Sequence, residues 1–179
     1  SGIDKYTIVG NLEADLSPKF KVGLNTFTSK QNKEGIVSQT SAGGTGAAGV
    51  IASAYRFMPD KGIYNADGTY TTTAPIGDDI DNPYATAMEN ILETVSIVNR
   101  NNFFAQYQIT KDLDFKTTLG LTDNNSQTGR FIPSTLIAGK NIKGEASVNN
   151  TRFSSFLTEN YLTFKREIID KGILTVLGG

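Results

Sequence analysis

The 179-residue sequence contains no cysteine and no histidine. Without cysteine there are no disulfides or thiolate metal sites, and without histidine the commonest general base and the usual zinc ligand are missing. An S-x-x-K motif is also absent, so this route to an activated nucleophile is closed. Paired carboxylates are the one catalytic arrangement that the composition leaves open. We therefore predict that the chain is not an enzyme, has no catalytic residues and needs no cofactor.

Neither sign of charge is in excess, and long apolar runs are lacking. The 17 basic and 18 acidic residues give a formal charge of -1, which provides no electrostatic case for nucleic-acid binding. No run of about 18 apolar residues is present to form a transmembrane helix, whereas the alternating strands of a transmembrane β-barrel remain allowed. The N-terminal residues lack the basic start and apolar core of a signal peptide. The chain is expected to be either cytoplasmic or an internal piece of an exported protein.

What the sequence does contain is a two-residue alternation of apolar and polar side chains. From Lys5 to Leu16 the apolar residues occupy even positions and the polar residues odd ones, with Val9 as the exception. This period is that of a strand with one apolar and one polar face. A tight turn at Ser17-Pro18-Lys19 leads into a second alternating segment at 19–28, so the two segments form a predicted β-hairpin.

The same alternation predicts two further hairpins. Their strands are expected at residues 93–110, 113–122, 149–167 and 173–179. Turns at Lys111-Asp112 and at Asp170-Lys171-Gly172 join the members of each pair. The predicted fold is therefore all-β, an antiparallel meander of about six strands in three hairpins, with short helices at Ala47–Phe57 and Asn82–Ile91. Asn82 is the expected N-cap of the second helix, and Pro83 its first residue.

The connections between the strands alternate in length. Short turns join the strands within each hairpin, whereas long loops are predicted at 29–92 and 123–148. Short turns on one side and long loops on the other are typical of outer-membrane barrels, in which the long loops are extracellular. Six strands are too few to close such a barrel. We therefore interpret the chain as part of a larger transmembrane β-barrel.

The long insertion from Met58 to Tyr84 links this pattern to a known family. It reads MPDKGIYNADGTYTTTAPIGDDIDNPY, with a Pro, an Asn-Ala-Asp-Gly-Thr-Tyr turn and then Asn-Pro in this order. Together with NLEADLSPKFKVGLN, YQITKDLDFKTTLGL and TENYLTFKR, it resembles the barrel region of the SusC/RagA family of TonB-linked outer-membrane proteins of Bacteroidetes. The resemblance extends over essentially the whole chain, and its specificity lies in the order and spacing of these segments.

The resemblance implies a function in nutrient uptake. Members of this family import oligosaccharides or peptides through the bacterial outer membrane. A SusD-like surface lipoprotein would be the partner that closes the transporter as a lid, and TonB would supply the energy. Membrane lipid would surround the barrel, and the plug domain of the family is not expected within these residues.

Three groups of residues are candidates for contacts. Aromatic side chains on the insertion offer rigid surface for a ligand or a lid, although they can equally pack the loop against the barrel; they are Tyr55, Phe57, Tyr64, Tyr70 and Tyr84. Polar positions of the strands are expected to face the aqueous lumen; they include Asn11, Glu13, Arg100, Asn102, Gln106, Lys116 and Glu159. Some of the strand aromatics would form girdles at the bilayer interfaces; these are Tyr6, Phe20, Phe103, Tyr107, Phe115, Tyr161 and Phe164.

Two further motifs are weaker indications of a binding site. Asp78, Asp79 and Asp81 offer oxygen ligands for Ca²⁺ but lack the Gly and Glu of a complete EF-hand loop, which favours a solvated acidic loop and no metal. The segment 44–49 matches G-x-G-x-x-G without the preceding buried strand that dinucleotide binding requires.

Two alternatives to the transporter remain open from the residues alone. One is a soluble carbohydrate-binding β-sandwich that would recognise its ligand through loop tyrosines. The other is a purely structural surface domain. Face alternation by itself does not separate a lipid-facing sheet from the core of a sandwich.

Overall fold

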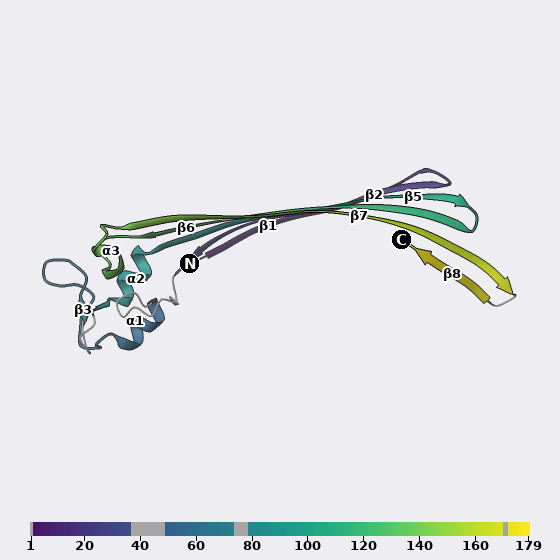
Figure 1. Ribbon diagram of the computed structural model, residues 1–179. Coiled ribbons are helices and arrows are strands. Elements are labelled where there is room, and N and C mark those ends of the chain that lie inside the picture. Colours follow the sequence, from purple (N-terminus) through teal and green to yellow (C-terminus); the bar gives the residue numbers. More distant parts are fainter. Residues whose placement is uncertain (1, 37–48, 74–78, 170–171) are drawn as a thin grey trace. The chain divides into compact units, whose positions relative to one another are not determined.

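The main element of the structure is one six-stranded sheet. The computed structural model describes residues 2–36, 49–73, 79–169 and 172–179. Neighbouring strands follow one another in the order β1-β2-β5-β6-β7-β8 (Figure 1). They are β1 (Gly2–Ser17), β2 (Phe20–Gly35), β5 (Ile91–Thr110), β6 (Leu113–Ile132), β7 (Glu145–Ile169) and β8 (Gly172–Gly178). The predicted all-β meander of three hairpins is confirmed.

Five of the six strands are longer than the sequence predicted, and β8 has the predicted length. β2 continues to Gly35 and β6 to Ile132, so the connections lie at 36–90 and 133–144 instead of 29–92 and 123–148. On β2, and on β6 up to Arg130, the added residues are polar or glycine on both faces, which removes the alternation but not the backbone hydrogen bonding. The hydroxyls of Ser96 and Ser126, for example, lie 3.1 Å apart across β5 and β6. Backbone pairing of the strands therefore extends beyond the residues whose hydrophobic alternation predicted them.

The chain divides into two compact units, which we describe separately. The sheet unit comprises Lys5–Lys30, Ser96–Ser126 and Thr151–Gly179. The loop unit comprises Gln31–Val95 and Gln127–Asn150 with the first four residues.

The two faces of the sheet unit differ in chemistry. Alternate residues of a strand lie on the same face. The apolar face carries Leu12, Val22, Phe103, Leu119 and the residues that alternate with them along the same strands. The polar face carries Glu13, Lys21, Gln106, Lys116 and the residues that alternate with those. Contacts between strands fix this assignment. The rings of Phe20 and Tyr107 meet edge to face at 6.3 Å on the apolar face, and Lys21 Nζ lies 3.5 Å from Asp15 Oδ1 on the polar face.

Apolar side chains of the sheet unit remain exposed. Ile8, Leu12 and Leu16 are 70%, 67% and 63% exposed. Within the described residues, every buried hydrophobic side chain lies in the loop unit; these are Ile80, Ala85, Ile132 and Leu136. A β-sandwich would place a second sheet over the apolar face, but the only other ladder among the described residues is formed by β3 (Thr72–Thr73) and β4 (Ile80–Asp81).

An aromatic ring also lies on the polar face, an arrangement that the sequence analysis missed. Phe104 on β5 packs across Gly23 on β2, where an added Cβ would lie only 2.1 Å from the ring atom Cε1. Lys116 Nζ lies 5.0 Å from the centroid of the same ring. Gly23 is therefore needed for its lack of a side chain, and the lysine covers the ring with a cation–π contact.

The loop unit gathers three short helices. They are α1 (Val50–Arg56), α2 (Pro83–Glu89) and α3 (Ile137–Lys140), which lie close to β3 in Figure 1. The predicted N-cap is confirmed, since Asn82 Oδ1 accepts a hydrogen bond from Tyr84 N at 2.9 Å and Pro83 opens α2. α1 falls within the predicted helix at 47–57, whereas α3 was not predicted. No helix among the described residues is long and apolar enough to span a membrane.

We predict that Gly23→Ala destabilises the protein. The new methyl group would force Phe104 out of its position, and such overpacking costs about 1–3 kcal/mol. Urea unfolding followed by circular dichroism would measure this loss. Gly129→Ala on β6 is the matched control, because a Cβ there meets nothing within 4 Å, and it should be neutral. Phe104→Ala should make Gly23→Ala harmless; additive losses in the double variant would contradict the proposed contact.

Candidate functional site

The insertion between β2 and β5 is held together by a buried asparagine. Asn82 is 3% exposed. Its Nδ2 donates to the backbone oxygen of Ile63 at 3.1 Å and to Thr71 Oγ1 at 3.0 Å, while its Oδ1 caps α2. One side chain thus joins both ends of the segment 63–71 to the start of α2.

The segment 63–71 forms a small hairpin around the predicted Asp-Gly turn. Tyr64 and Tyr70 form its β-bridge. Gly68 has a φ of 83°, a conformation that glycine adopts without cost. Asp67 Oδ1 accepts hydrogen bonds from Thr69 N at 3.0 Å and Thr69 Oγ1 at 2.6 Å, which lowers the pKa of this carboxyl. The turn is therefore ordered by its own side chains.

Three of the five candidate loop aromatics come together. Tyr64 stacks on Tyr70 with ring centroids 5.2 Å apart and meets Tyr84 edge to face at 6.5 Å. Tyr70 packs against the buried cluster of Ala85, Ile132 and Leu136, and burial raises the pKa of its hydroxyl to about 12. Tyr64 and Tyr84 keep 54% and 42% of their surface exposed. The cluster has a supporting ring and two accessible rings.

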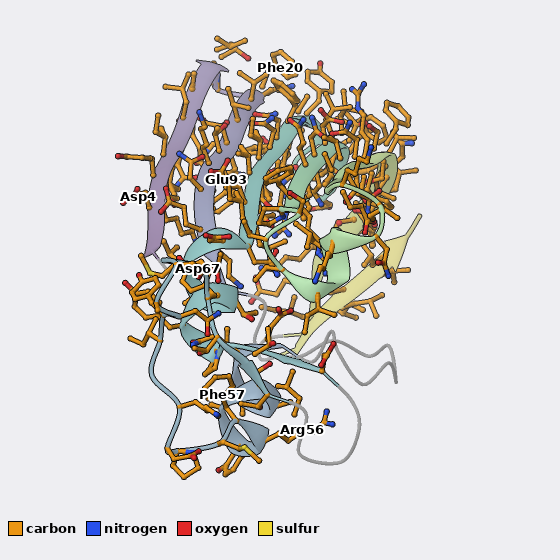
Figure 2. The ribbon with its side chains drawn as sticks, turned by 90° about the vertical axis from the view of Figure 1, so that its left-hand side faces the viewer. Asp4, Phe20, Arg56, Phe57, Asp67 and Glu93 are labelled. Atoms are coloured by element: carbon orange, nitrogen blue, oxygen red, sulfur yellow. The ribbon has the colours of Figure 1, made fainter. Side chains whose placement is uncertain are left out.

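The other two loop aromatics lie at α1. Tyr55 is 89% exposed, and Phe57, labelled beside Arg56 in Figure 2, is partly buried at the C-cap. No ring contact joins either residue to the tyrosine cluster within the described part of the chain. Tyr55 is therefore accessible as a separate position.

Asp81 is buried for a structural purpose. It is 5% exposed, and both of its carboxylate oxygens accept from Ile137 N, at 2.9 and 3.1 Å. Burial raises the pKa of Asp81 to about 6, and the charge of Asp79 adds to the effect. Asp81 thereby fastens the start of α3 to β4. Sequence reasoning could not find this contact, because its partners are 56 positions apart.

Neither weak motif gains a binding geometry. Asp79 is exposed, Asp81 is engaged by Ile137, and Asp78 lies outside the described residues. No group of three or more acidic side chains that could hold a metal ion occurs among the residues that the structure describes. In the G-x-G-x-x-G segment, residues 44–48 also lie outside the described residues, and Gly49 precedes α1.

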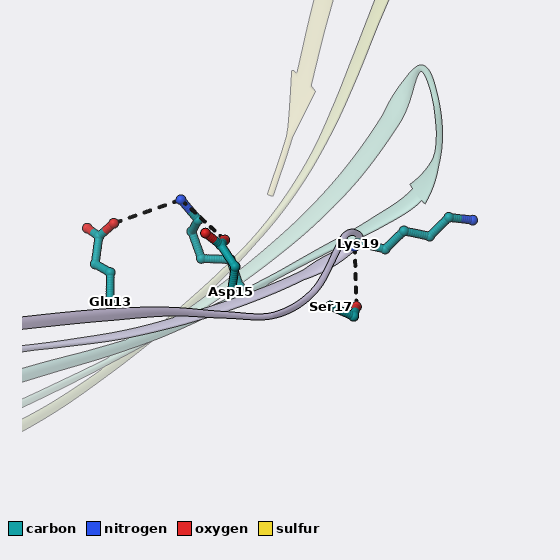
Figure 3. A network of polar contacts seen from close by, with 5 residues as sticks. Glu13, Asp15, Ser17 and Lys19 are labelled. Carbon is teal, nitrogen blue, oxygen red and sulfur yellow. Dashed lines mark hydrogen bonds and ion pairs between the residues drawn. The ribbon is translucent and has the colours of Figure 1, made fainter.

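The seven residues predicted to face the lumen share the polar face of the sheet unit. Lys21 Nζ lies 3.9 Å from Glu13 Oε2 as well as 3.5 Å from Asp15 (Figure 3). Thr118 Oγ1 donates to Glu159 Oε2 at 3.3 Å, and a Cβ on Gly120 would lie 3.1 Å from Asn102 Oδ1. The full set consists of Asn11, Glu13, Arg100, Asn102, Gln106, Lys116 and Glu159, which have matching parity along paired strands.

The strand aromatics mostly occupy the opposite face. Phe20 and Tyr107 are in contact there, and strand parity places Tyr6, Phe103, Phe115 and Phe164 on the same side. Tyr161 has the parity of Glu159 and therefore lies on the polar face. A hydrophobicity pattern cannot sort tyrosine by face, because the side chain suits both surroundings.

We predict that acidification stabilises the loop unit through Asp81. The folded-state pKa of about 6 lies above the ordinary value of 3.8, so this stabilisation is complete below pH 3.8 and is lost as the pH rises through 6. Hydrogen–deuterium exchange of residues 133–144, corrected for intrinsic rates, should be slower at pH 5 than at pH 7. Asp81→Asn should abolish the difference.

The control for this experiment is Asp67→Asn. Asp67 belongs to the same unit, but its pKa is lowered rather than raised. This variant should keep the pH dependence of exchange at 133–144. An unchanged pH dependence in Asp81→Asn would show that another group is responsible.

Comparison with known proteins adds sequence relatives. No family model matches the chain. Two proteins of Formosa agariphila are similar over its whole length: TonB-dependent receptor P3 at 46% identity and TonB-dependent receptor P26 at 30%. The chain covers 18% and 17% of these relatives, respectively.

Solved structures share the fold. The RagAB peptide importer matches in its open-open state with a TM-score of 0.69 at 20% identity, and in its closed-closed state with 0.69 at 21%. In both, the match covers 98% of this chain and 19% of the solved chain. The predicted resemblance is confirmed: the chain corresponds over its whole length to a segment of TonB-dependent receptors and shares its fold with the RagAB importer.

Proposed function

We propose that this chain forms part of the wall of a TonB-dependent transporter that imports a nutrient across the bacterial outer membrane. The observation that carries this proposal is the apolar face of the sheet unit. Its side chains are exposed, and the opposite face carries an ion network. Bilayer on one side and water on the other satisfy both faces of a single-layer sheet.

The apolar band has the height that a membrane requires. On β6 the apolar parity runs from Leu113 to Leu121 and ends at Asp123. This span agrees with the roughly 9 to 11 residues with which a tilted strand crosses the hydrocarbon layer. β6 continues to Ile132, so its second half would stand outside the bilayer on the side of the long connections.

In this orientation the polar face lines the lumen. The seven polar residues described above would then lie along the route of the nutrient, with Lys21 and its acidic partners near the short-turn end. The connections at 36–90 and 133–144 would be extracellular.

The nutrient is an oligosaccharide or a peptide, and the loop aromatics are its proposed contacts. Tyr64 presents a ring that stacks on the packed ring of Tyr70, and Tyr84 meets Tyr64 edge to face. Rigid aromatic surface suits both sugar rings and peptide side chains. Exposed Tyr55 on α1 and partly buried Phe57 at its C-cap are the proposed contacts of a SusD-like surface lipoprotein acting as a lid. The RagAB peptide importer offers the precedent of peptide as cargo for this fold.

We predict that the polar face of the sheet unit tolerates an introduced arginine, whereas the apolar face does not. In the full-length protein, Leu12→Arg should destabilise the membrane-inserted state by about 2–4 kcal/mol, because it moves a charge into hydrocarbon. Asn11→Arg, one residue away on the polar face, is the matched control and should insert normally. Recovery of folded protein from the outer-membrane fraction measures the difference.

Two outcomes would contradict the transporter. Equal recovery of both arginine variants would mean that the faces do not differ in surroundings. Folding of the wild-type protein in detergent-free buffer, without association with membranes, would instead support a soluble domain, because an exposed apolar face of this size should aggregate in water.

We further predict that the two accessible tyrosines contribute to nutrient binding. Tyr64→Ala and Tyr84→Ala should each weaken binding about fivefold, the loss expected for one aromatic contact of about 1 kcal/mol. Titration of the reconstituted full-length protein with oligosaccharides and with peptides, in separate arms, measures this loss and identifies the cargo class. Tyr6→Ala on the apolar face should leave binding unchanged. Equal affinities in all variants would assign the cluster to loop packing alone.

A further inference from the structure

The connection between β6 and β7, residues 133–144, inserts one side chain into the interior of the loop unit. Leu136 is 2% exposed and forms the buried cluster together with Ala85 of α2 and the last residue of β6. Tyr70 packs against this cluster. The ring on which Tyr64 stacks therefore rests on a side chain that comes from the other long connection.

Polar contacts fasten the residues on either side of this leucine. Thr135 Oγ1 donates a hydrogen bond to the carboxylate of Glu89 on α2, and Ile137 N donates to Asp81 Oδ1 on β4 at 2.9 Å. Hydrogen bonds to charged acceptors are stronger than those between neutral groups. Burial, and then a hydrogen bond to Glu89, raise the pKa of the Tyr70 hydroxyl. The carboxylate that holds the 133–144 loop thus also holds the supporting ring.

The 133–144 loop is closed on itself by backbone contacts. Leu136 N donates to Pro133 O at 3.3 Å, and Gly144 N donates to Gly139 O at 2.9 Å. Gly139 lies so close to Pro133 that an added Cβ would collide with the proline carbonyl oxygen. Because these contacts close the loop, its three docking residues keep their positions relative to one another.

We propose that the 133–144 loop is a brace for the tyrosine cluster, and that Leu136 is a positioning residue for nutrient binding. In the docked loop, Leu136 supports Tyr70, and Tyr64 stacks on Tyr70 with ring centroids 5.2 Å apart. Withdrawal of Leu136 removes the apolar support of Tyr70, so the stacked rings lose their fixed position. The inference rests on the proposed function in one respect, namely that these rings contact the nutrient.

The internal fastening of the insertion does not replace this brace. Asn82 bonds the backbone oxygen of Ile63 and the hydroxyl of Thr71, which fixes the path of the backbone but not the tilt of the rings. Leu136 acts on the ring of Tyr70 itself. Its burial excludes direct contact with a nutrient, so any effect on affinity must pass through the rings. The coupling is reciprocal, since a ligand that favours the restrained rings also favours the docked loop.

The test uses the full-length protein in membranes, with meta-fluorotyrosine in place of Tyr64, and follows its fluorine NMR resonance. Leu136→Ala should move the resonance most of the way toward the shift of free meta-fluorotyrosine. Leu136→Met, which keeps the side-chain volume, should leave it near the wild-type shift. Ile142→Ala is the matched control, because it removes a 56% exposed side chain from the same loop, and it should have no effect.

A second variant acts on the brace without changing its docking residues. Gly139→Ala distorts the loop through the collision with Pro133 and should move the resonance in the same direction, so it decides the question where Leu136→Ala gives no folded protein. Hydrogen exchange of the Phe57 amide, which donates to Ser53 O at 2.8 Å in α1, should stay at the wild-type rate in both variants.

Three results would overturn the brace. One is an unchanged resonance in Leu136→Ala, and another is an equal movement in Ile142→Ala. The third is faster exchange at Phe57 whenever the resonance moves, which would indicate unfolding of the loop unit as a whole.

The same variants test the link to the nutrient. An oligosaccharide library and a tryptic digest of serum albumin are the probes, in separate arms. Leu136→Ala should weaken the binding that the wild type shows by about fivefold or more, whereas Ile142→Ala should not. Unchanged affinity in Leu136→Ala would overturn the role of Leu136 in nutrient binding. A wild type that binds neither probe would contradict the proposed nutrient contacts, while the resonance of the labelled ring would still decide the brace.

Discussion

The structure depends on one geometric constraint: each strand places consecutive residues on opposite faces of a sheet that is a single layer in the described residues. A shift of one residue in a strand would exchange its entire apolar and polar sets. Leu12 and Asn11 are adjacent in sequence yet require different surroundings. Because the hydrophobic side chains of the sheet unit are not buried against other described residues, the medium on each side must satisfy that face.

Departures from the alternation are compensated locally. Phe104 is apolar on the polar face, where Gly23 makes room for its ring and Lys116 covers it with a cation. Asp123 is charged at the end of the apolar parity that runs from Leu113 to Leu121 on β6, and there Arg152 and Ser154 from β7 engage its carboxylate. Both of these exceptions have partners on neighbouring strands. Such pairs follow from strand register, which the single sequence does not state.

This distinction explains how much could be predicted. The faces of β1 and β2 and the start of α2 follow from local patterns, namely the alternation from Lys5 to Leu16 and the Asn82-Pro83 cap. The continuation of β2 to Gly35 and of β6 past Asp123 did not, because both faces carry polar residues from there to Gly35 and Arg130 while backbone pairing continues. α3 was missed because its start depends on Asp81, whose partner Ile137 is remote in the sequence. Clustering of Tyr64, Tyr70 and Tyr84 likewise required the fold.

The loop unit is ordered by contacts among its own residues, and this order would affect how strongly it binds a ligand. Asn82 fixes both ends of the segment 63–71, and Tyr70 anchors that segment to the buried cluster of Ala85, Ile132 and Leu136. Folding therefore already restrains the ring of Tyr64, which stacks on Tyr70. A ligand that contacts a restrained ring loses less affinity to the ordering of side chains than one that contacts a free ring. In the proposed binding of a nutrient, the buried polar and apolar contacts behind the tyrosines would thus matter as much as the exposed rings themselves.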